Sequence, residues 1–419
     1  MKPRYFILIA FACCLINTKA TAQDTNWIKK NTWYFDNFVK DTLSWAIFRE
    51  TFIGVAPAPS ADFDQLFYTY LFRDQLASKG HCYGMDVMAM LMKKNGGHLG
   101  YCHPPYMYSG SYASNTNPSG TPSNDTVGPS DRNLRTAIEM VHGNQINHGF
   151  LSFLLDVIVK HKNRDGRYAY QQVDYYLAKD DQPIISVTGD ISPQKGGHVL
   201  IPYFTETLGG TKKIYVYDPN RSWYKAGPDG HDWYVNRNNF VEINAGSGAW
   251  TYHMCCDTVW AGDPGSGGNL LVIPLSIAGK KDRLPQSLLA DGSYAINNIM
   301  IWGNVKVEQI SDMTGSKRYL NEKGTDLEPC EENRLDNIMP FIPMDGNAPS
   351  KGNDKAVTYF FRGSDPVKLQ YKAWGQYKIG MIFHGKYYEV KGEGSGITQH
   401  FLPEEKLLKN SISPTGSAN

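Results

Sequence analysis

The chain has 419 residues, of which 41% are hydrophobic and 20% charged, and its formal net charge is +1. A charge balance this close to neutral argues against a nucleic-acid partner and against binding to an anionic membrane surface. The length predicts two to three domains of about 150 residues each, in a globular protein with many loops.

Residues 1–22 have the pattern of a secretory signal peptide. Lys2 and Arg4 precede an apolar run over residues 5–16, and Ala20-Thr21-Ala22 offers a cleavage site of small residues. The run is too short to span a bilayer, and no later apolar run is long enough for a transmembrane helix. We therefore expect a secreted product, or one exported to the periplasm or the cell surface.

The cysteines predict one free thiol. Loss of Cys13 and Cys14 with the signal peptide leaves an odd number in the mature chain: Cys82, Cys102, Cys255, Cys256 and Cys330. In an exported protein an odd number suggests that one thiol stays unpaired. Two disulfides among the last four, with Cys82 free, would fit. The alternative is that Cys82 is simply buried and the others are unpaired.

The first part of the mature chain has helical patterns. Residues 62–76 carry an apolar face at helical spacing and end at Lys79-Gly80. Residues 82–94 are apolar on nearly all sides, which is typical of a buried helix. A flexible loop, serving as a lid or simply disordered, is predicted at 104–132 from its Ser, Thr, Asn, Pro and Gly content. Three further helices are predicted at 133–141, 148–162 and 167–178.

After residue 178 the apolar pattern changes to the alternation of strands. The predicted strands are 183–188, 198–204, 213–217, 231–235, 240–243 and 249–254. Helices followed by an antiparallel sheet give an α+β fold for the domain predicted at 23–265.

A Pro- and Gly-rich stretch at 263–268 marks a predicted domain boundary. The short β-like runs beyond it are 270–277, 295–301, 305–309, 356–362, 370–373, 377–383 and 386–390. Such runs are typical of a sandwich or a small barrel. We therefore expect an all-β, sandwich-like domain at 266–419.

Cys82 lies between Gly80 and Gly84 at the start of the predicted buried helix. A cysteine enzyme needs a thiolate, so it must lower the thiol pKa. A helix N-terminus favours the thiolate through its dipole, and its N–H groups can also donate to an oxyanion. The alternative is an inert cysteine of the core.

His198 is the best candidate for a base, because it follows Gly196-Gly197 at the start of an apolar strand. The next strand ends in Asp218-Pro219-Asn220, and a turn is predicted near Leu208. His198 and Asp218 are equidistant from that turn and would face each other, with Cα atoms about 5 Å apart. Asp218 would then orient the imidazole, with Asn220 as a backup. The simpler alternatives are a structural histidine and an ordinary turn.

The stretches GHCYGM, GGHVLIPYF and YVYDPN together resemble the papain-like cysteine peptidase superfamily, in particular the bacterial C39-like peptidases. The resemblance covers about residues 60–260 and implies a helical half followed by an antiparallel β half. It implies Cys82 as nucleophile, His198 as general base and acid, and Asp218 as orienter. Papain-like enzymes also carry a glutamine before the nucleophile as oxyanion donor. Gln75 is near that place, and Gln145 is a second candidate.

We therefore expect an exported thiol hydrolase that cleaves peptide or amide bonds in a peptide or protein substrate, without a cofactor or a metal. The C-terminal domain would serve attachment to the cell surface, carbohydrate contact or substrate recruitment. The alternative is a catalytically inactive papain-like exported protein that binds carbohydrate or peptide. Cleavage of amides outside proteins, as in peptidoglycan, would use the same residues.

Overall fold

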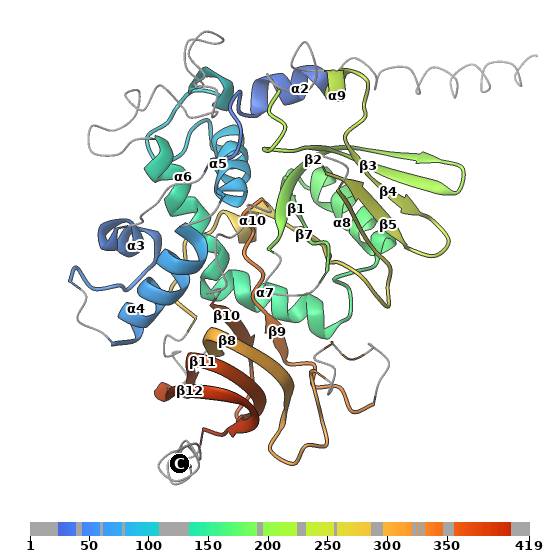
Figure 1. Ribbon diagram of the computed structural model, residues 1–419. Coiled ribbons are helices and arrows are strands. Elements are labelled where there is room, and N and C mark those ends of the chain that lie inside the picture. Colours follow the sequence, from blue (N-terminus) through green and yellow to red (C-terminus); the bar gives the residue numbers. More distant parts are fainter. Residues whose placement is uncertain are drawn as a thin grey trace, which may run out of the picture.

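The computed structural model describes residues 24–38, 44–58, 62–77, 80–108, 134–190, 196–223, 232–254, 258–285, 296–320, 325, 327, 332–346 and 356–403. These residues form an α+β fold with two antiparallel sheets (Figure 1), as the sequence predicts. The signal peptide predicted at 1–22, the part of the predicted loop at 109–132, and Cys255, Cys256 and Cys330 lie outside the described residues.

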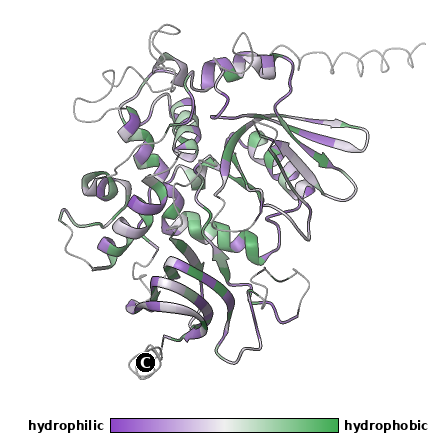
Figure 2. Cartoon of the chain, viewed as in Figure 1, coloured by the Kyte–Doolittle hydropathy of each residue, from purple (hydrophilic) through white to green (hydrophobic). Residues whose placement is uncertain are grey.

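The helical part comes first in the chain. Its elements are α2 (Asp24–Asn31), α3 (Trp45–Thr51), α4 (Asp62–Leu66), the π-helix η1 (Phe67–Ala77), α5 (Cys82–Asn95), the 3₁₀ turns η2 (Pro105–Tyr108) and η3 (Asn144–Ile146), α6 (Leu134–Gly143), α7 (His148–Val159) and α8 (Gly166–Ala178). Every predicted helix is confirmed with small differences at its ends. Figure 2 shows hydrophobic residues concentrated along α7, where Phe150, Leu151 and Leu155 are buried.

In the described residues the larger sheet has seven strands in the order β6-β5-β4-β3-β2-β1-β7. Their bounds are β1 (Ile184–Val187), β2 (His198–Leu208), β3 (Thr211–Tyr217), β4 (Phe240–Asn244), β5 (Trp250–His253), β6 (Val259–Gly262) and β7 (Leu270–Ile273). The strand predicted at 231–235 is wrong, because this stretch contains the helical turn α9 (Asp232–Val235). Four residues are too few for sequence period to separate strand from helix.

The domain boundary predicted at residue 265 lies too early. β7 pairs with β1 over its whole length and so completes the larger sheet. The short helix α10 (Leu275–Ala278) follows and packs against α5 and α7. β7 is a short apolar run buried throughout, and such a run carries no sequence signal of the sheet to which it belongs.

The smaller sheet has five strands within the described residues, in the order β12-β11-β8-β10-β9. Their bounds are β8 (Asn297–Asp312), β9 (Ile338–Pro340), β10 (Val357–Phe361), β11 (Val367–Phe383) and β12 (Lys386–Phe401). The runs predicted at 295–301 and 305–309 join into β8, and those at 370–373 and 377–383 join into β11. This part is one antiparallel sheet, whereas the predicted sandwich would need two facing sheets.

α5 is the central helix of the molecule. Its residues from Cys82 to Met92 are all buried, and Gly96 in the left-handed conformation follows its end. Gly84 allows α6 to approach closely, because a Cβ there would lie 2.3 Å from the carbonyl oxygen of Ile138. α5 also packs against β2. Its N-terminus is therefore held inside the molecule, beside the larger sheet.

After β9 the chain leaves the smaller sheet and runs up between the helices and the larger sheet (Figure 1). Met344 forms an isolated parallel bridge with Gly197, the residue before β2. We call residues 341–346 the inserted segment. Among the described residues, no helix combines the length and the apolar character needed to cross a membrane.

Candidate active site

His198 and Asp218 form a buried pair at the larger sheet. His198 is the first residue of β2, and Asp218 directly follows β3. Nε2 of His198 lies 2.6 Å from Oδ1 of Asp218, and their side chains are 0% and 1% exposed. Because a carboxylate accepts hydrogen bonds, this contact assigns the proton of a neutral imidazole to Nε2. The other ring nitrogen, Nδ1, is buried without a hydrogen-bond partner among the described residues and can accept a proton.

The register predicted for this hairpin is wrong, although the contact forms. β2 and β3 pair from Leu208 and Thr211 down to Ile201 and Tyr217, with a bulge that shifts the register along the way. The turn therefore lies later than predicted, and Asp218 follows the last pair instead of facing the histidine in the ladder. The side chains of His198 and Asp218 still reach each other, because the two residues lie at the same end of neighbouring strands.

Asp218 is held by several donors. The Tyr252 hydroxyl donates to Oδ2 at 2.5 Å, and the Asn220 backbone N–H donates to Oδ1 at 2.8 Å. Burial by itself would raise the pKa of this carboxyl, but the charge and hydrogen bond of His198 and the bonds from Tyr252 and Asn220 bring the pKa below its ordinary value. Asp218 is therefore a carboxylate at neutral pH and can stabilise a protonated imidazole.

The Cys82 thiol lies at the N-terminus of α5 and is completely buried. Its Sγ is 3.2 Å from the carbonyl oxygen of Met344, and it also has a hydrogen bond with the backbone of Val199, the residue after His198. The thiol is thus next to the start of β2. The helix, the histidine strand and the carboxylate meet at one place.

The pKa of the Cys82 thiol is raised, whereas the sequence predicts a lowered value. Burial is the largest cause, followed by the carboxylates of Asp86 and Asp345, and the Val199 hydrogen bond only partly opposes them. Asp345 belongs to the inserted segment. The thiol is consequently neutral in this closed arrangement, and the segment contributes to that state.

The inserted segment contacts both the thiol and the residue that precedes the histidine strand. The Gly197 N–H donates to the carbonyl of Pro343 at 2.8 Å, and the Gly197 carbonyl accepts from the N–H groups of Asp345 and Gly346, each at 3.0 Å. A Cβ on Gly346 would lie 3.4 Å from Nδ1 of His198. The segment therefore covers the ring nitrogen that would take the thiol proton.

The two predicted oxyanion glutamines take different positions. The Gln75 amide donates to the Thr358 hydroxyl of β10 at 3.0 Å and so belongs to the contact with the smaller sheet. Gln145 lies beside the site, but its Oε1 accepts from the Met344 N–H at 2.9 Å while its Nε2 faces His142. Gln145 thus presents an acceptor, and not a donor, to the inserted segment.

The backup role predicted for Asn220 would require a hydrogen bond from its side chain to the imidazole, but this side chain bonds elsewhere. Its Nδ2 donates to the Gly346 carbonyl and its Oδ1 accepts from Asn37, each at 3.0 Å. Its contribution to the pair is the backbone N–H bond to Asp218.

Asn37 is a site residue that the sequence reasoning missed. Its Nδ2 donates to the Asp345 carbonyl at 3.2 Å, and its Oδ1 accepts from the backbone N–H of His81, the residue before Cys82, at 2.6 Å. It is thus a side-chain amide that donates to the peptide carbonyl one residue after Met344, whose own carbonyl contacts the thiol. No sequence signal could identify it, because Asn37 and Asp345 lie 308 positions apart in the chain.

Asp86, one turn after Cys82, is a buried acid that the sequence reasoning did not consider. Neither carboxyl oxygen has a hydrogen-bond partner among the described residues. Burial, and secondarily the charge of Asp218, raise its pKa well above the ordinary 3.8. A raised folded-state pKa means that the stability of the fold is greatest below that ordinary value and is lost as the pH rises towards the folded-state pKa.

Asp86→Asn is therefore expected to stabilise the protein at neutral pH. The variant removes the free-energy cost of keeping the carboxyl protonated, and we expect a gain of about 1–3 kcal/mol in the free energy of unfolding. The gain should largely vanish at pH values below the ordinary Asp pKa. Urea unfolding at neutral and acidic pH measures both values, and a loss of stability at neutral pH would contradict the account.

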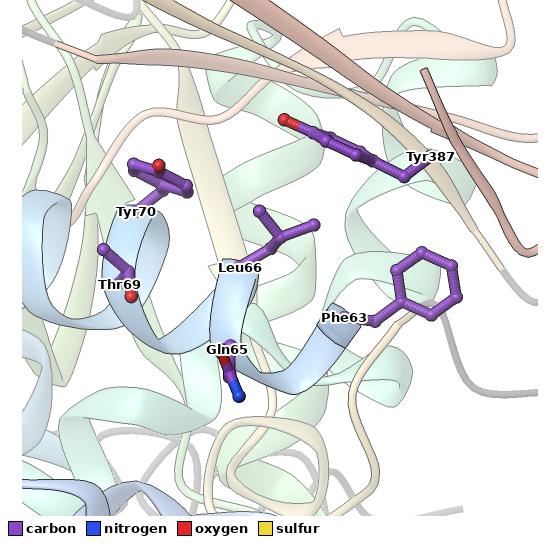
Figure 3. A pocket seen from close by; sticks show the side chains of 6 residues that line it. All are labelled: Phe63, Gln65, Leu66, Thr69, Tyr70 and Tyr387. Atoms are coloured by element: carbon purple, nitrogen blue, oxygen red, sulfur yellow. The ribbon is translucent and has the colours of Figure 1, made fainter. Parts of the chain in front are cut away.

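The remaining predicted features lie away from this centre. Of the two described cysteines, Cys102 is an exposed free thiol, so the predicted pair of disulfides, which needs Cys102, is not formed. A surface cavity of about 610 Å³ lies between the α4–η1 helix and β12 (Figure 3). Its lining residues are Phe63, Gln65, Leu66, Thr69, Tyr70 and Tyr387. None of them belongs to the site around Cys82.

Comparison of the chain with protein-family models, with curated proteins and with solved structures finds no match. The case for a function therefore depends on the geometry of Cys82, His198 and Asp218.

Proposed function

We propose that this chain is an exported thiol hydrolase that cleaves peptide bonds, on a papain-like arrangement of nucleophile, base and orienter. The observation that carries the proposal is the His198–Asp218 pair. Its proton-accepting Nδ1 is left without a partner, and the thiol of a helix N-terminus lies against the next residue of the same strand. Cysteine hydrolases need a nucleophile, a base that takes its proton and an orienter of that base, and Cys82, His198 and Asp218 are side chains of the matching types.

In the proposed reaction, Nδ1 of His198 takes the proton of the Cys82 thiol as Sγ attacks the carbonyl carbon of a peptide bond. The imidazolium is stabilised by Asp218 and gives this proton to the leaving amine as the C–N bond breaks. Water, deprotonated by the same nitrogen, then hydrolyses the thioester and restores the thiol. Each step uses only the side chains named here, the peptide and water.

Asn37 is the proposed oxyanion donor, because its amide already donates to a backbone carbonyl at the site. Asn37→Ala is expected to lower kcat by about 10²–10³-fold with a smaller change in KM, since a donor to the oxyanion acts mainly in the transition state. Steady-state kinetics on a cleaved peptide measure the two constants. A rise in KM with kcat unchanged would assign Asn37 to substrate binding instead.

The proposal is tested by incubating the protein with a pool of peptides and identifying new termini by mass spectrometry. Wild type and Gly346→Ala are both assayed, because the added Cβ would disturb the inserted segment at the site. We expect new termini that are absent with Cys82→Ala in either background. If neither form with an intact Cys82 cleaves any peptide, the hydrolase proposal is wrong.

One observation favours the alternative of a catalytically inactive exported protein that binds peptide or carbohydrate. The raised pKa of the Cys82 thiol leaves it neutral and unreactive in the closed site. The aromatic side chains of the cavity in Figure 3 would suit carbohydrate contact. A Cys82 thiol that stays unreactive after the site is opened would favour this alternative.

A further inference from the structure

The inserted segment makes backbone contacts on both sides of the thiol. On the N-terminal side, the Pro343 carbonyl accepts a hydrogen bond from the Gly197 N–H, and the Met344 N–H donates to the Gln145 side chain. Downstream, the carbonyls of Asp345 and Gly346 accept from the amides of Asn37 and Asn220. The Met344 carbonyl between them is 3.2 Å from Sγ of Cys82. This continuous set of main-chain bonds does not depend on the identity of the side chains.

Main-chain bonding to an extended peptide is how many proteins bind peptides, with side-chain pockets adding specificity. The segment shows such a pocket at one position, because the Met344 side chain is only 3% exposed and packs in the main hydrophobic core. The other main-chain contacts come from residues at the catalytic centre itself. Gly197 precedes His198, and Asn220 supports Asp218 through its backbone.

We propose that residues 341–346 fill the peptide-binding groove of this site, so that the enzyme is latent until its own segment is displaced. The groove then accepts an extended peptide that bonds to Gly197 and places an apolar side chain where Met344 lies. This inference rests on the proposed function, because a latent enzyme requires that the site is catalytic. Closure of the groove is tested separately through the rate at which a reagent reaches the Cys82 thiol, without any hydrolysis.

Gly346→Ala is designed to displace the segment. Gly346 has φ +81°, and a Cβ there would lie 2.3 Å from Nδ2 of Asn37 and 3.1 Å from Oδ1 of Asn220. We expect the rate of Cys82 alkylation by iodoacetamide to rise at least about tenfold over wild type, which corresponds to about 1.4 kcal/mol. Labelled sites are assigned by peptide mapping. Met344→Ala, which removes the buried anchor, should raise the same rate.

Two controls separate displacement from general destabilisation. Gly315→Ala imposes a similar backbone strain at φ +76°, but its Cβ would meet nothing within 4 Å, so Cys82 labelling should stay at the wild-type rate. The exposed Cys102 is an internal reference that should label equally fast in all variants. Fast Cys82 labelling in the wild type, or unchanged slow labelling in both Gly346→Ala and Met344→Ala, would overturn the closed groove.

A synthetic peptide with the sequence of residues 341–346 provides a second measurement. Added to Gly346→Ala, it should slow Cys82 labelling again, and the same peptide with Asp in place of Met344 should be at least about tenfold weaker. Equal effects of both peptides would contradict the proposal that the groove takes an apolar side chain where Met344 lies. Faster labelling without peptide hydrolysis would keep the closed groove and reject the hydrolase, so the two proposals can fail separately.

Discussion

Cys82→Ala in the Gly346→Ala background is expected to reduce peptide hydrolysis by about 10⁶-fold. The thiol is the nucleophile that attacks the peptide bond in the proposed reaction, and no side chain named at the site can replace it in forming a thioester. The measurement is kcat/KM with a fluorogenic peptide chosen from those that the opened enzyme cleaves.

The matched control is Cys102→Ala in the same background. Cys102 is the other described free thiol, it is exposed, and it takes no part in the site. Its loss should leave kcat/KM within about twofold of the parent, as is usual for surface substitutions. Hydrolysis that survives the loss of Cys82, or that depends on Cys102, would show that another group performs the reaction.

Asp218→Ala is expected to lower kcat by about 10³–10⁴-fold, because the imidazole loses its orientation and the charge that stabilises its protonated form. It should also lower the free energy of unfolding by about 3–5 kcal/mol, because a fully buried partner is removed from His198. Steady-state kinetics and urea unfolding measure the two effects on the same preparation.

Two milder variants should lose less stability than Asp218→Ala. In Asp218→Asn an amide oxygen still accepts from Nε2 of His198, so most of the stability should return. Tyr252→Phe removes a single donor to Oδ2 and should cost about 1–3 kcal/mol. The lowered pKa of Asp218 stabilises the fold above pH 3.8, and this stability is lost as the pH falls. Tyr252→Phe removes one of the hydrogen bonds that lower this pKa. The variant should therefore unfold at a higher pH than wild type during acid titration. A wild-type kcat in Asp218→Ala would show that the carboxylate has no role in the reaction.

The fold was predictable where the sequence has a strong period. α5 is predicted as a buried helix because it is apolar on nearly all sides. β2 and β3 are predicted as strands because short runs rich in β-branched and aromatic residues flank a Gly-Gly turn. β7 could not be assigned to its sheet, because a short apolar strand has no sequence signal for its neighbour. The exact position of the turn was equally hard to predict, because Leu208 pairs with Thr211 and this register already differs from the predicted one before the bulge is reached.

The site was predictable only in its local part. His198 and Asp218 lie on one hairpin, so sequence spacing could bring them to the same end of two strands. Their partners come from distant parts of the chain, since Cys82 and Met344 are 262 positions apart. The raised thiol pKa has burial as its largest cause, followed by Asp86 on the same helix and then by Asp345 of the distant inserted segment. The local sequence indicates the burial of the helix, but it does not indicate the approach of Asp345.

An acyl group on Cys82 is detected by measuring the mass of the protein during turnover. Gly346→Ala is mixed with a cleavable peptide, quenched in acid within the first turnover and analysed intact and after digestion. We expect a transient mass increase equal to the acyl part of the peptide, located on Cys82 and absent with Cys82→Ala. Peptide cleavage without any acyl group on Cys82 would contradict the proposed reaction.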